Sequence, residues 1–398
     1  MSVSMPSYEH FKEPDELKKI RREAWDLYTK LPFPDRAGTL WRFSDPEKFW
    51  ITPENIGSVL DKGNIVYNYE APTGLHFLDL SEAVTEESVP VGTLVGAEFG
   101  KYEALNMALW QKGSYLKIPE GVRIEKPVVL RKNISGNGLL TDRAILHVSK
   151  GASLTIVEVL EGKLSGDGYL NAVEEVFVEE GASLTLVGVD LTQGETRALV
   201  TVRHSIGSNA ELVWVIARFG EGLLKANLGA RLAGQGAKSR IFGAVFGLGQ
   251  GKSDIHTFHD HAVKRTFSNI DLRVVLRDHA NSAYTGLIRI GTDAPCSEAF
   301  QENRNLLLSG GVRAESIPEL EILTDEVHCK HGVTVGPVEE EPLFYLMSRG
   351  VPKEDAVRLL VEGFLEPVLK PIPLEFREML DGRVAHFVGL TPEVEKVP

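Results

Sequence analysis

The residues best suited to metal or thiol chemistry are Cys329 and His331, in the stretch TDEVHCKHGVTVG at 324–336. On a β-strand their side chains would share one face, because side chains alternate with a period of two, and His328 would point the other way. A thiolate and an imidazole on one face make half of a site for a soft metal such as iron or zinc. The same spacing also fits a half-buried thiol near a surface imidazole.

A second group of candidate ligands is the histidine cluster in DIHTFHDHAVKRTFSN, which contains His256, His259 and His261. Three imidazoles within six residues could bind a metal, and His259 and His261 would share a face of a strand. Surface or corner histidines fit the pattern equally well, so the spacing leaves both interpretations open.

The composition is that of a globular protein, with 43% apolar and 25% charged residues. Acidic residues outnumber basic ones by 56 to 43, which argues against a nucleic-acid or anionic-membrane partner. Two cysteines, Cys296 and Cys329, rule out a disulfide framework and favour a reducing compartment. The N-terminus lacks the apolar run of a signal peptide, and no stretch approaches the ~20 apolar residues of a membrane span. We expect a soluble cytoplasmic protein.

The elements that must position these residues are predicted by an internal repeat. The segment ILHVSKGASLTIVEVLEG at 145–162 is echoed by EVFVEEGASLTLVGVDLTQG at 175–194, with Gly-Ala-Ser corners thirty residues apart. Looser copies follow as far as NRNLLLSGGVRAESIPELEIL. Short strands with small corner residues at a fixed period favour a β-solenoid, in which each coil buries its inner face by stacking on the next. A β-sandwich is the rival architecture.

Helical patterns flank this core. Residues 1–115 are predicted as an N-terminal helical and mixed region, 116–338 as the solenoid, and 339–398 as a C-terminal helical domain. A helix is expected to end at Gly350, a natural C′ residue. The next helix, in VPKEDAVRLLVEGFLEPVL, is expected to have one apolar face, formed by Ala356, Leu359, Leu360, Gly363 and Phe364.

With these residues in view, the chain resembles the SufB/SufD family of the SUF iron–sulfur cluster assembly system, from about residue 90 to 378. The resemblance is carried by SDIHTFHDHAVKRTFSN, AFQENRNLLLSGG, IPELEILTDEVHCKHGVTVG and EEEPLFYLMSRGVPKEDAVRLLVEGF. The C-x-H-G at 329–332 looks like the SufD branch. SufB members typically have a cysteine in the segment where this chain has Leu346.

The resemblance implies a mostly β protein built on a right-handed parallel β-helix. It implies a non-catalytic scaffold that supports cluster assembly and iron acquisition, paired with a SufB-type chain and docked by a SufC-type ATPase on its C-terminal helices. Cys329 and His331 carry over as residues near a transient iron–sulfur cluster or iron shared with the partner, and Glu375 as a further cofactor-binding position. No tightly bound cofactor is expected in the isolated chain, and Cys296 is left structural.

Iron–sulfur clusters usually need about four ligands, mostly thiolates, and this chain offers two thiols in unrelated segments. An all-cysteine site within one chain is therefore impossible, and a second chain would complete the site. A heterodimer and a two-fold homodimer both remain open. So do two other classes of protein, namely a polysaccharide-active β-helix enzyme and a structural adaptor that binds no metal.

Overall fold

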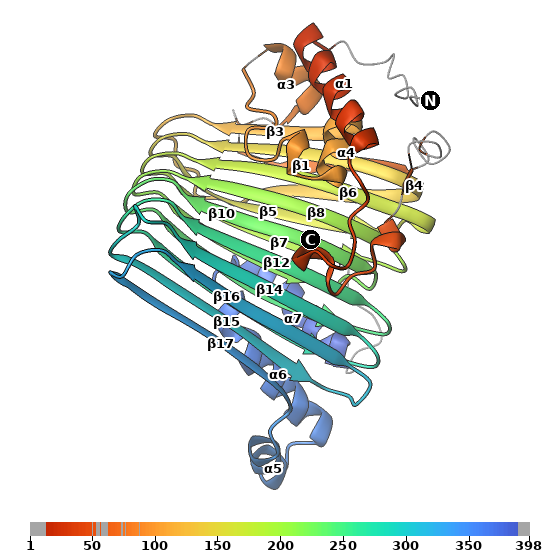
Figure 1. The fold of residues 1–398 in the computed structure, drawn as a ribbon. Coiled ribbons are helices and arrows are strands. Elements are labelled where there is room, and N and C mark those ends of the chain that lie inside the picture. Colours follow the sequence, from red (N-terminus) through yellow and green to blue (C-terminus); the bar gives the residue numbers. More distant parts are fainter. Residues whose placement is uncertain are drawn as a thin grey trace.

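The computed structural model describes residues 13–388 except 50, 53–55, 57–62, 73–74, 76 and 87. It is a parallel β-solenoid with helices at both chain ends, as the repeat predicts and as Figure 1 shows. The strands form two stacked ladders. Sheet A contains β3, β4, β6, β8, β10, β12, β14 and β16, and sheet B contains β4, β5, β7, β9, β11, β13, β15 and β17.

The solenoid strands run as follows: β3 Lys112–Ile118, β4 Val128–Val148, β5 Ser153–Gly162, β6 Ser165–Val178, β7 Ser183–Thr192, β8 Arg197–Ile206, β9 Glu211–Arg218, β10 Leu223–Leu232, β11 Lys238–Gly247, β12 Lys252–His261, β13 Phe267–Leu276, β14 Asn281–Ile290, β15 Ser297–Leu307, β16 Arg313–Ile322 and β17 Val327–Pro337. The elements before them are α1 Asp15–Lys30, η1 Thr39–Trp41, η2 Pro46–Phe49, β1 Gly63–Glu70, β2 Leu78–Asp79, α3 Leu80–Glu86, η3 Ala97–Phe99 and α4 Lys101–Leu109. After them come α5 Glu340–Ser348, α6 Lys353–Leu369 and α7 Leu374–Val388.

The Gly-Ala-Ser corners set the period of the stack. Ser153 at the start of β5 lies directly beside Ser183 at the start of β7, which confirms the thirty-residue repeat. Gly151 and Gly181 turn each corner with φ of 67°, a left-handed conformation that favours glycine. Equivalent residues of successive coils therefore stack in columns through the whole ladder.

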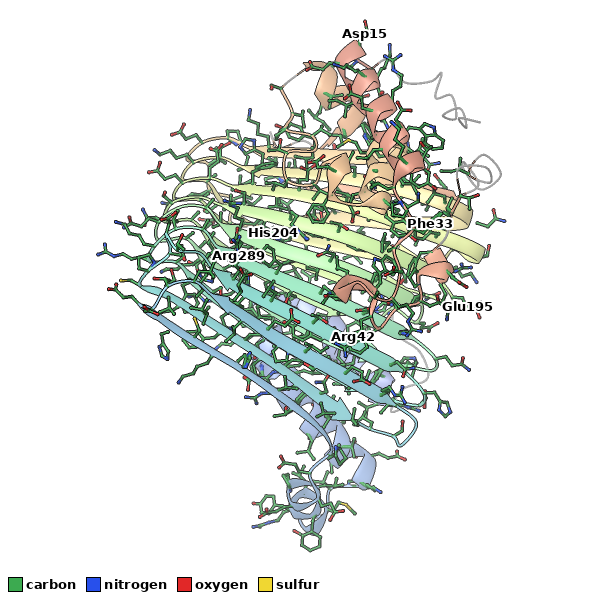
Figure 2. The ribbon with its side chains drawn as sticks, viewed as in Figure 1. Asp15, Phe33, Arg42, Glu195, His204 and Arg289 are labelled. Atoms are coloured by element: carbon green, nitrogen blue, oxygen red, sulfur yellow. The ribbon has the colours of Figure 1, made fainter. Side chains whose placement is uncertain are left out.

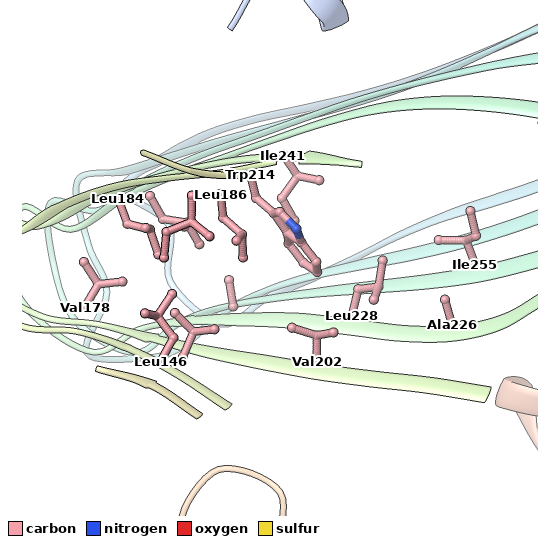
Figure 3. Packing of buried hydrophobic residues seen from close by; sticks show 14 of the residues in the cluster. Leu146, Val178, Leu184, Leu186, Val202, Trp214, Ala226, Leu228, Ile241 and Ile255 are labelled. Carbon is pink, nitrogen blue, oxygen red and sulfur yellow. The ribbon is translucent and has the colours of Figure 1, made fainter. Parts of the chain in front are cut away.

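The main core fills the space between the two sheets. Leu184, Leu186 and Trp214 of sheet B face Val202 and Leu228 of sheet A, and all five side chains are nearly inaccessible (Figure 3). The inner side chains of each coil pack against those of the coils above and below. Their burial is therefore complete only where a coil has neighbours on both sides.

The N-terminal elements cover the outer face of sheet A. Aromatic and aliphatic residues of α1 and α4 pack on outward side chains such as Tyr169 and Leu199. A fully buried ion pair reinforces the contact, with Arg143 Nη2 2.7 Å from Glu175 Oε1. The same carboxylate accepts backbone hydrogen bonds from Gly92 and Leu94, which ties the preceding loop to the sheet.

The C-terminal helices α6 and α7 cover the outer face of sheet B, where they form a second core with residues of β5, β7, β9 and β11. The buried residues of α6 are Ala356, Val361, Leu365, Val368 and Leu369. The predicted apolar face only partly coincides with the buried one, because Ala356 is buried and Phe364 packs against this core while other predicted residues do not. None of the described helices is long and apolar enough to cross a membrane.

Of the residues predicted for that face, Leu359 is 43% exposed and Gly363 is also exposed. The predicted end of α5 is confirmed, because Gly350 follows the helix with φ of 87°. α5 projects beyond the last coil (Figure 1).

The two ends of the stack differ. At the first end, β1 pairs antiparallel with β4 and β2 pairs antiparallel with β3, and Ile65 and Leu75 join the main core between the sheets. At the last end, β17 pairs with β15 along one edge, and its other edge has no strand pairing within the described part of the chain. Inner-face residues there are accordingly accessible, with Val333 38% and Val335 48% exposed.

Candidate functional site at the open end of the solenoid

Cys329 and His331 lie on β17 and share its inner face. In the register with β15, Cys329 lies beside Ala299 and His331 beside Gln301, and both β15 residues are buried. His328 lies on the opposite face and is exposed. The structure thus places the two candidate ligands on one face, as strand alternation predicts, and this face is directed toward the interior of the stack.

Cys329 is half-buried against a small apolar cluster near the end of the stack, formed by Ile288, Ile290 and Ala299 with Leu320. Burial raises the pKa of the Cys329 thiol above its ordinary value, and a backbone hydrogen bond with Ala299 acts in the opposite direction. The thiolate is the form that binds metals and attacks electrophiles. The raised pKa favours the thiol over the thiolate of Cys329 at neutral pH in the isolated chain.

His331 is exposed although it lies on the inner face. Its exposure results from the missing next coil, since the equivalent inner-face residues of earlier strands are covered on both sides. A ring nitrogen at this position can reach a molecule docked on the end of the stack. Cys329 and His331 together place two potential donor groups, one thiol and one imidazole, on the inner face at this end.

Beneath the last coil lies a polar layer that our sequence analysis missed. Gln301, Asn303 and Asn305 are buried on the inner face of β15, where the preceding strand β13 has Ile270, Leu272 and Val274. Asn305 Nδ2 donates to Asn303 Oδ1 at 2.8 Å and to the Thr334 carbonyl of β17 at 3.1 Å. The alternation Q-x-N-x-N within AFQENRNLLLSGG is the signal that could have revealed it.

Glu375, the third predicted site residue, lies elsewhere. It is exposed in the first turn of α7, which packs on the outer face of sheet B, whereas Cys329 and His331 line the inner face of β17. Its role in binding a cofactor stays a prediction, and the geometry gives it no shared donor set with the pair.

The donor set at the open end is incomplete within this chain. Over the described ranges, no three or more His, Cys, Asp or Glu side chains are grouped so as to hold a metal. Cys296 is exposed at the corner before β15, and its Sγ lies 3.7 Å from a carboxylate oxygen of Glu326. A metal or cluster bound by Cys329 and His331 would need its remaining ligands from another molecule.

The histidine cluster of β12 is divided between two faces. His256 lies on the outer face and contacts Asp254 at 3.1 Å. His259 and His261 are buried inside the stack, where they contact hydroxyl groups, such as Ser239 Oγ at 2.9 Å from His259 Nε2. Burial lowers the pKa of His259 to about 3 and that of His261 to about 4. These two histidines are neutral, hydrogen-bonded core residues.

A third histidine, His204 on β8, lies in the same interior and can be located in Figure 2. Its ring meets that of Trp214 at 4.4 Å between centroids, and burial lowers its pKa to about 3. The interior therefore contains three imidazoles that remain uncharged in the folded chain.

Buried carboxylates also lie inside the stack, around a cavity of about 170 Å³. Lys132 Nζ is 3.5 Å from Asp142 and 3.7 Å from Glu158, and burial followed by the charge of Glu158 raises the pKa of Glu174 to about 8. A polysaccharide-active β-helix would be expected to place its carboxylates along an outer groove. The enclosed position of this cluster does not favour that class of enzyme.

The fold and its open end thus define a parallel β-solenoid with two candidate soft-metal ligands, Cys329 and His331, at an uncovered coil. Residues 131–364, more than half of the chain, match the family model described as SUF system FeS cluster assembly, SufBD core domain. The chain belongs to the SufBD family, and membership implies involvement in iron–sulfur cluster assembly.

Full-length relatives agree with this assignment. Iron–sulfur cluster assembly SufBD family proteins of Staphylococcus saprophyticus and Staphylococcus haemolyticus are each 26% identical over 407 residues. A protein of the same description from Staphylococcus aureus shows the same identity. In each comparison the alignment covers 92% of this chain and 87% of the relative.

The buried histidines predict a loss of stability in mild acid. Above the ordinary histidine pKa of 6.5, the three imidazoles are neutral in both the folded and the unfolded chain. Below this pH, the unfolded chain binds protons that the folded chain excludes. The free energy of unfolding should decrease from pH 6.5 toward pH 4, by about 2 kcal/mol per histidine between pH 6.5 and 5. Denaturant unfolding at each pH measures this. A flat profile for the wild type, or an equally steep one for His259→Gln, would contradict the assignment.

The environment of Cys329 predicts slow alkylation. Because burial shields the thiol and raises its pKa, iodoacetamide at pH 7.5 should modify Cys329 at least about tenfold more slowly than a free thiol. Its rate should still be rising with pH above 9. Mass spectrometry of a Cys296→Ser chain measures the rate, with a cysteine-containing peptide as the control. Modification as fast as that of the peptide would contradict the account.

Proposed function

We propose that this chain is a SufD-like scaffold subunit of the SUF machinery, with a role in cluster assembly and iron acquisition but no catalytic step of its own. The observation that carries the proposal is the pair Cys329 and His331 on the inner face of the uncovered strand β17. In this proposal the nascent iron–sulfur cluster, or the iron that enters it, is cargo held between this chain and a partner.

The number of donors supports a shared site. A cluster needs about four ligands, and the open end supplies one thiol and one imidazole. A SufB-type chain that covers this end would add the others. A mixed donor set also suits a scaffold that must release its cargo.

The shape of the open end is consistent with a partner chain that stacks on β17 as a further coil. The free edge of β17 offers unpaired backbone groups, which are a template for strand addition. Ile322 and Leu323, together with Val333 and Val335, expose apolar surface at the same end. A partner strand laid along β17 would satisfy the backbone groups and bury these side chains in one step. A second copy of this chain could form the same contact when no SufB-type chain is present.

The exposed apolar side chains of α5 are the evidence for proposing that a SufC-type ATPase docks on this helix. Among the residues of α5, Phe344 is 73%, Tyr345 57% and Met347 43% exposed, and aromatic residues with methionine are typical of interface cores. β17 ends at Pro337 and α5 begins at Glu340. Movement of an ATPase bound to α5 would therefore act on the strand that carries Cys329 and His331 through a linker of two residues.

The proposal predicts that His331→Ala impairs cluster formation. In a complex with the SufB-type and SufC-type partners, supplied with ATP, iron and a sulfur donor, the variant should form cluster about tenfold more slowly or less completely. Absorbance and iron content measure the product. His328→Ala is the matched control, because His328 lies on the opposite face of the same strand. Unchanged assembly by His331→Ala would remove His331 from the mechanism and favour a structural adaptor.

Docking on α5 predicts a second effect. Phe344→Asp should weaken binding of the SufC-type ATPase by about tenfold or more, because it places a charge in the apolar surface. Isothermal titration calorimetry measures the affinity. Leu374→Asp is the control, since Leu374 is 72% exposed on α7 and lies outside the proposed surface. Equal affinities for wild type and Phe344→Asp would exclude α5 as the docking site.

A further inference from the structure

The polar layer beneath the last coil contains one buried hydrogen-bonding atom without a partner. Gln301 is 3% exposed. Its Nε2 donates to the Gly286 carbonyl of sheet A at 3.2 Å, but its Oε1 is buried and accepts no hydrogen bond from any described residue. Buried polar atoms are nearly always paired, so this exception calls for a donor close by.

The register of sheet B places one candidate donor next to Gln301, although no hydrogen bond joins the two side chains in the structure. On the inner face, Gln301 is stacked between Ile270 of β13 on one side and His331 of β17 on the other. Ile270 is a hydrocarbon side chain and can donate nothing. His331 lies one strand spacing away, about 4.8 Å, and a neutral imidazole carries one N–H donor and one acceptor nitrogen.

The amide of Gln301 is held in place from the opposite sheet. Gly286 has no side chain, and a Cβ added there would lie 2.3 Å from Gln301 Nε2 and 2.3 Å from the Tyr284 hydroxyl. The absence of a side chain therefore makes room for the amide to reach the Gly286 carbonyl. With its N–H₂ group fixed in this way, the carbonyl oxygen has little freedom to turn elsewhere.

We propose that Gln301 is a positioning residue for His331, and this inference rests on the proposed function. In this proposal the exposed His331 ring turns toward Gln301, a contact that the structure does not itself contain, and Gln301 Oε1 then accepts a hydrogen bond from one ring N–H. That bond fixes the tautomer and the orientation of the ring. The other ring nitrogen then carries its lone pair toward the open end, where it is ready to bind iron or a cluster. Ligating histidines in metal sites are oriented by such a second hydrogen bond.

The test is ¹⁵N NMR of the imidazole rings in the isolated chain, with labelled histidine at a pH where the rings are neutral. His331→Ala identifies the His331 signals among those of the 11 histidines. In the wild type, the two His331 nitrogens should show the widely separated shifts of a single tautomer. In Gln301→Met, which keeps the length but removes the acceptor, the shifts should move toward the averaged values of a free imidazole.

Two further variants complete the design. Gln301→Glu retains a carbonyl acceptor at the same place and should preserve the wild-type tautomer. Asn303→Met removes a buried amide from the same strand, but its neighbour on β17 is Val333, so the His331 signals should not change.

If the two ¹⁵N shifts of His331 are already averaged in the wild type, the proposal is overturned without any variant. It is also overturned if Gln301→Met leaves those shifts unchanged. These signals are recorded without partners or iron. Failure of this inference is therefore distinguishable from failure of the shared-site function, which the assembly assay with His331→Ala tests separately.

Discussion

In a parallel strand ladder, the last strand has backbone hydrogen-bonding groups and inner side chains with no neighbour on one side. This constraint determines most of what the molecule can do. Every inner coil is paired and packed on both sides, but the final coil has a free backbone edge and an inner face without a neighbour. At the first end, β1 and β2 pair antiparallel with β4 and β3, and Ile65 and Leu75 join the main core. At the last end the chain leaves β17 uncovered and places Cys329 and His331 there.

The composition of the interior changes along the stack in a way that fits this asymmetry. The middle coils are closed by Leu, Ile, Val and Trp side chains. β15, the last strand but one in sheet B, instead carries Gln301, Asn303 and Asn305, which are hydrogen-bonded within the stack. A polar layer beneath an open coil can position neighbouring side chains and tolerate water, whereas a purely apolar layer exposed there would favour aggregation.

Much of the architecture could be predicted from the sequence, because the length of a sequence repeat gives the spacing between strands that stack on one another. The thirty-residue spacing of the Gly-Ala-Ser corners fixed the register that places Ser153 beside Ser183. Strand alternation placed Cys329 and His331 on one face. It could not say that this face is the inner one, because that depends on the register with β15, nor that the coil is the last.

Other features depended on tertiary packing that no local pattern contains. The apolar face predicted for α6 coincides only in part with its buried face, because Val361 and Leu365 are buried while Leu359 faces solvent. The histidines of β12 could not be separated into ligands and core residues until the hydroxyl groups of Ser239 and Ser268 were seen beside them. The pairing of Gln301 with His331 required the register of two strands separated by thirty residues.

The most direct test of the account is amide hydrogen exchange along β17 in the isolated chain and in its complex with a SufB-type partner. The account predicts rapid exchange over 327–337 in the isolated chain and at least about tenfold slower exchange in the complex. Exchange in β5 and β7, which are paired on both sides, should be slow in both states. Equal exchange of β17 with and without the partner would contradict the claim that another chain covers the open end.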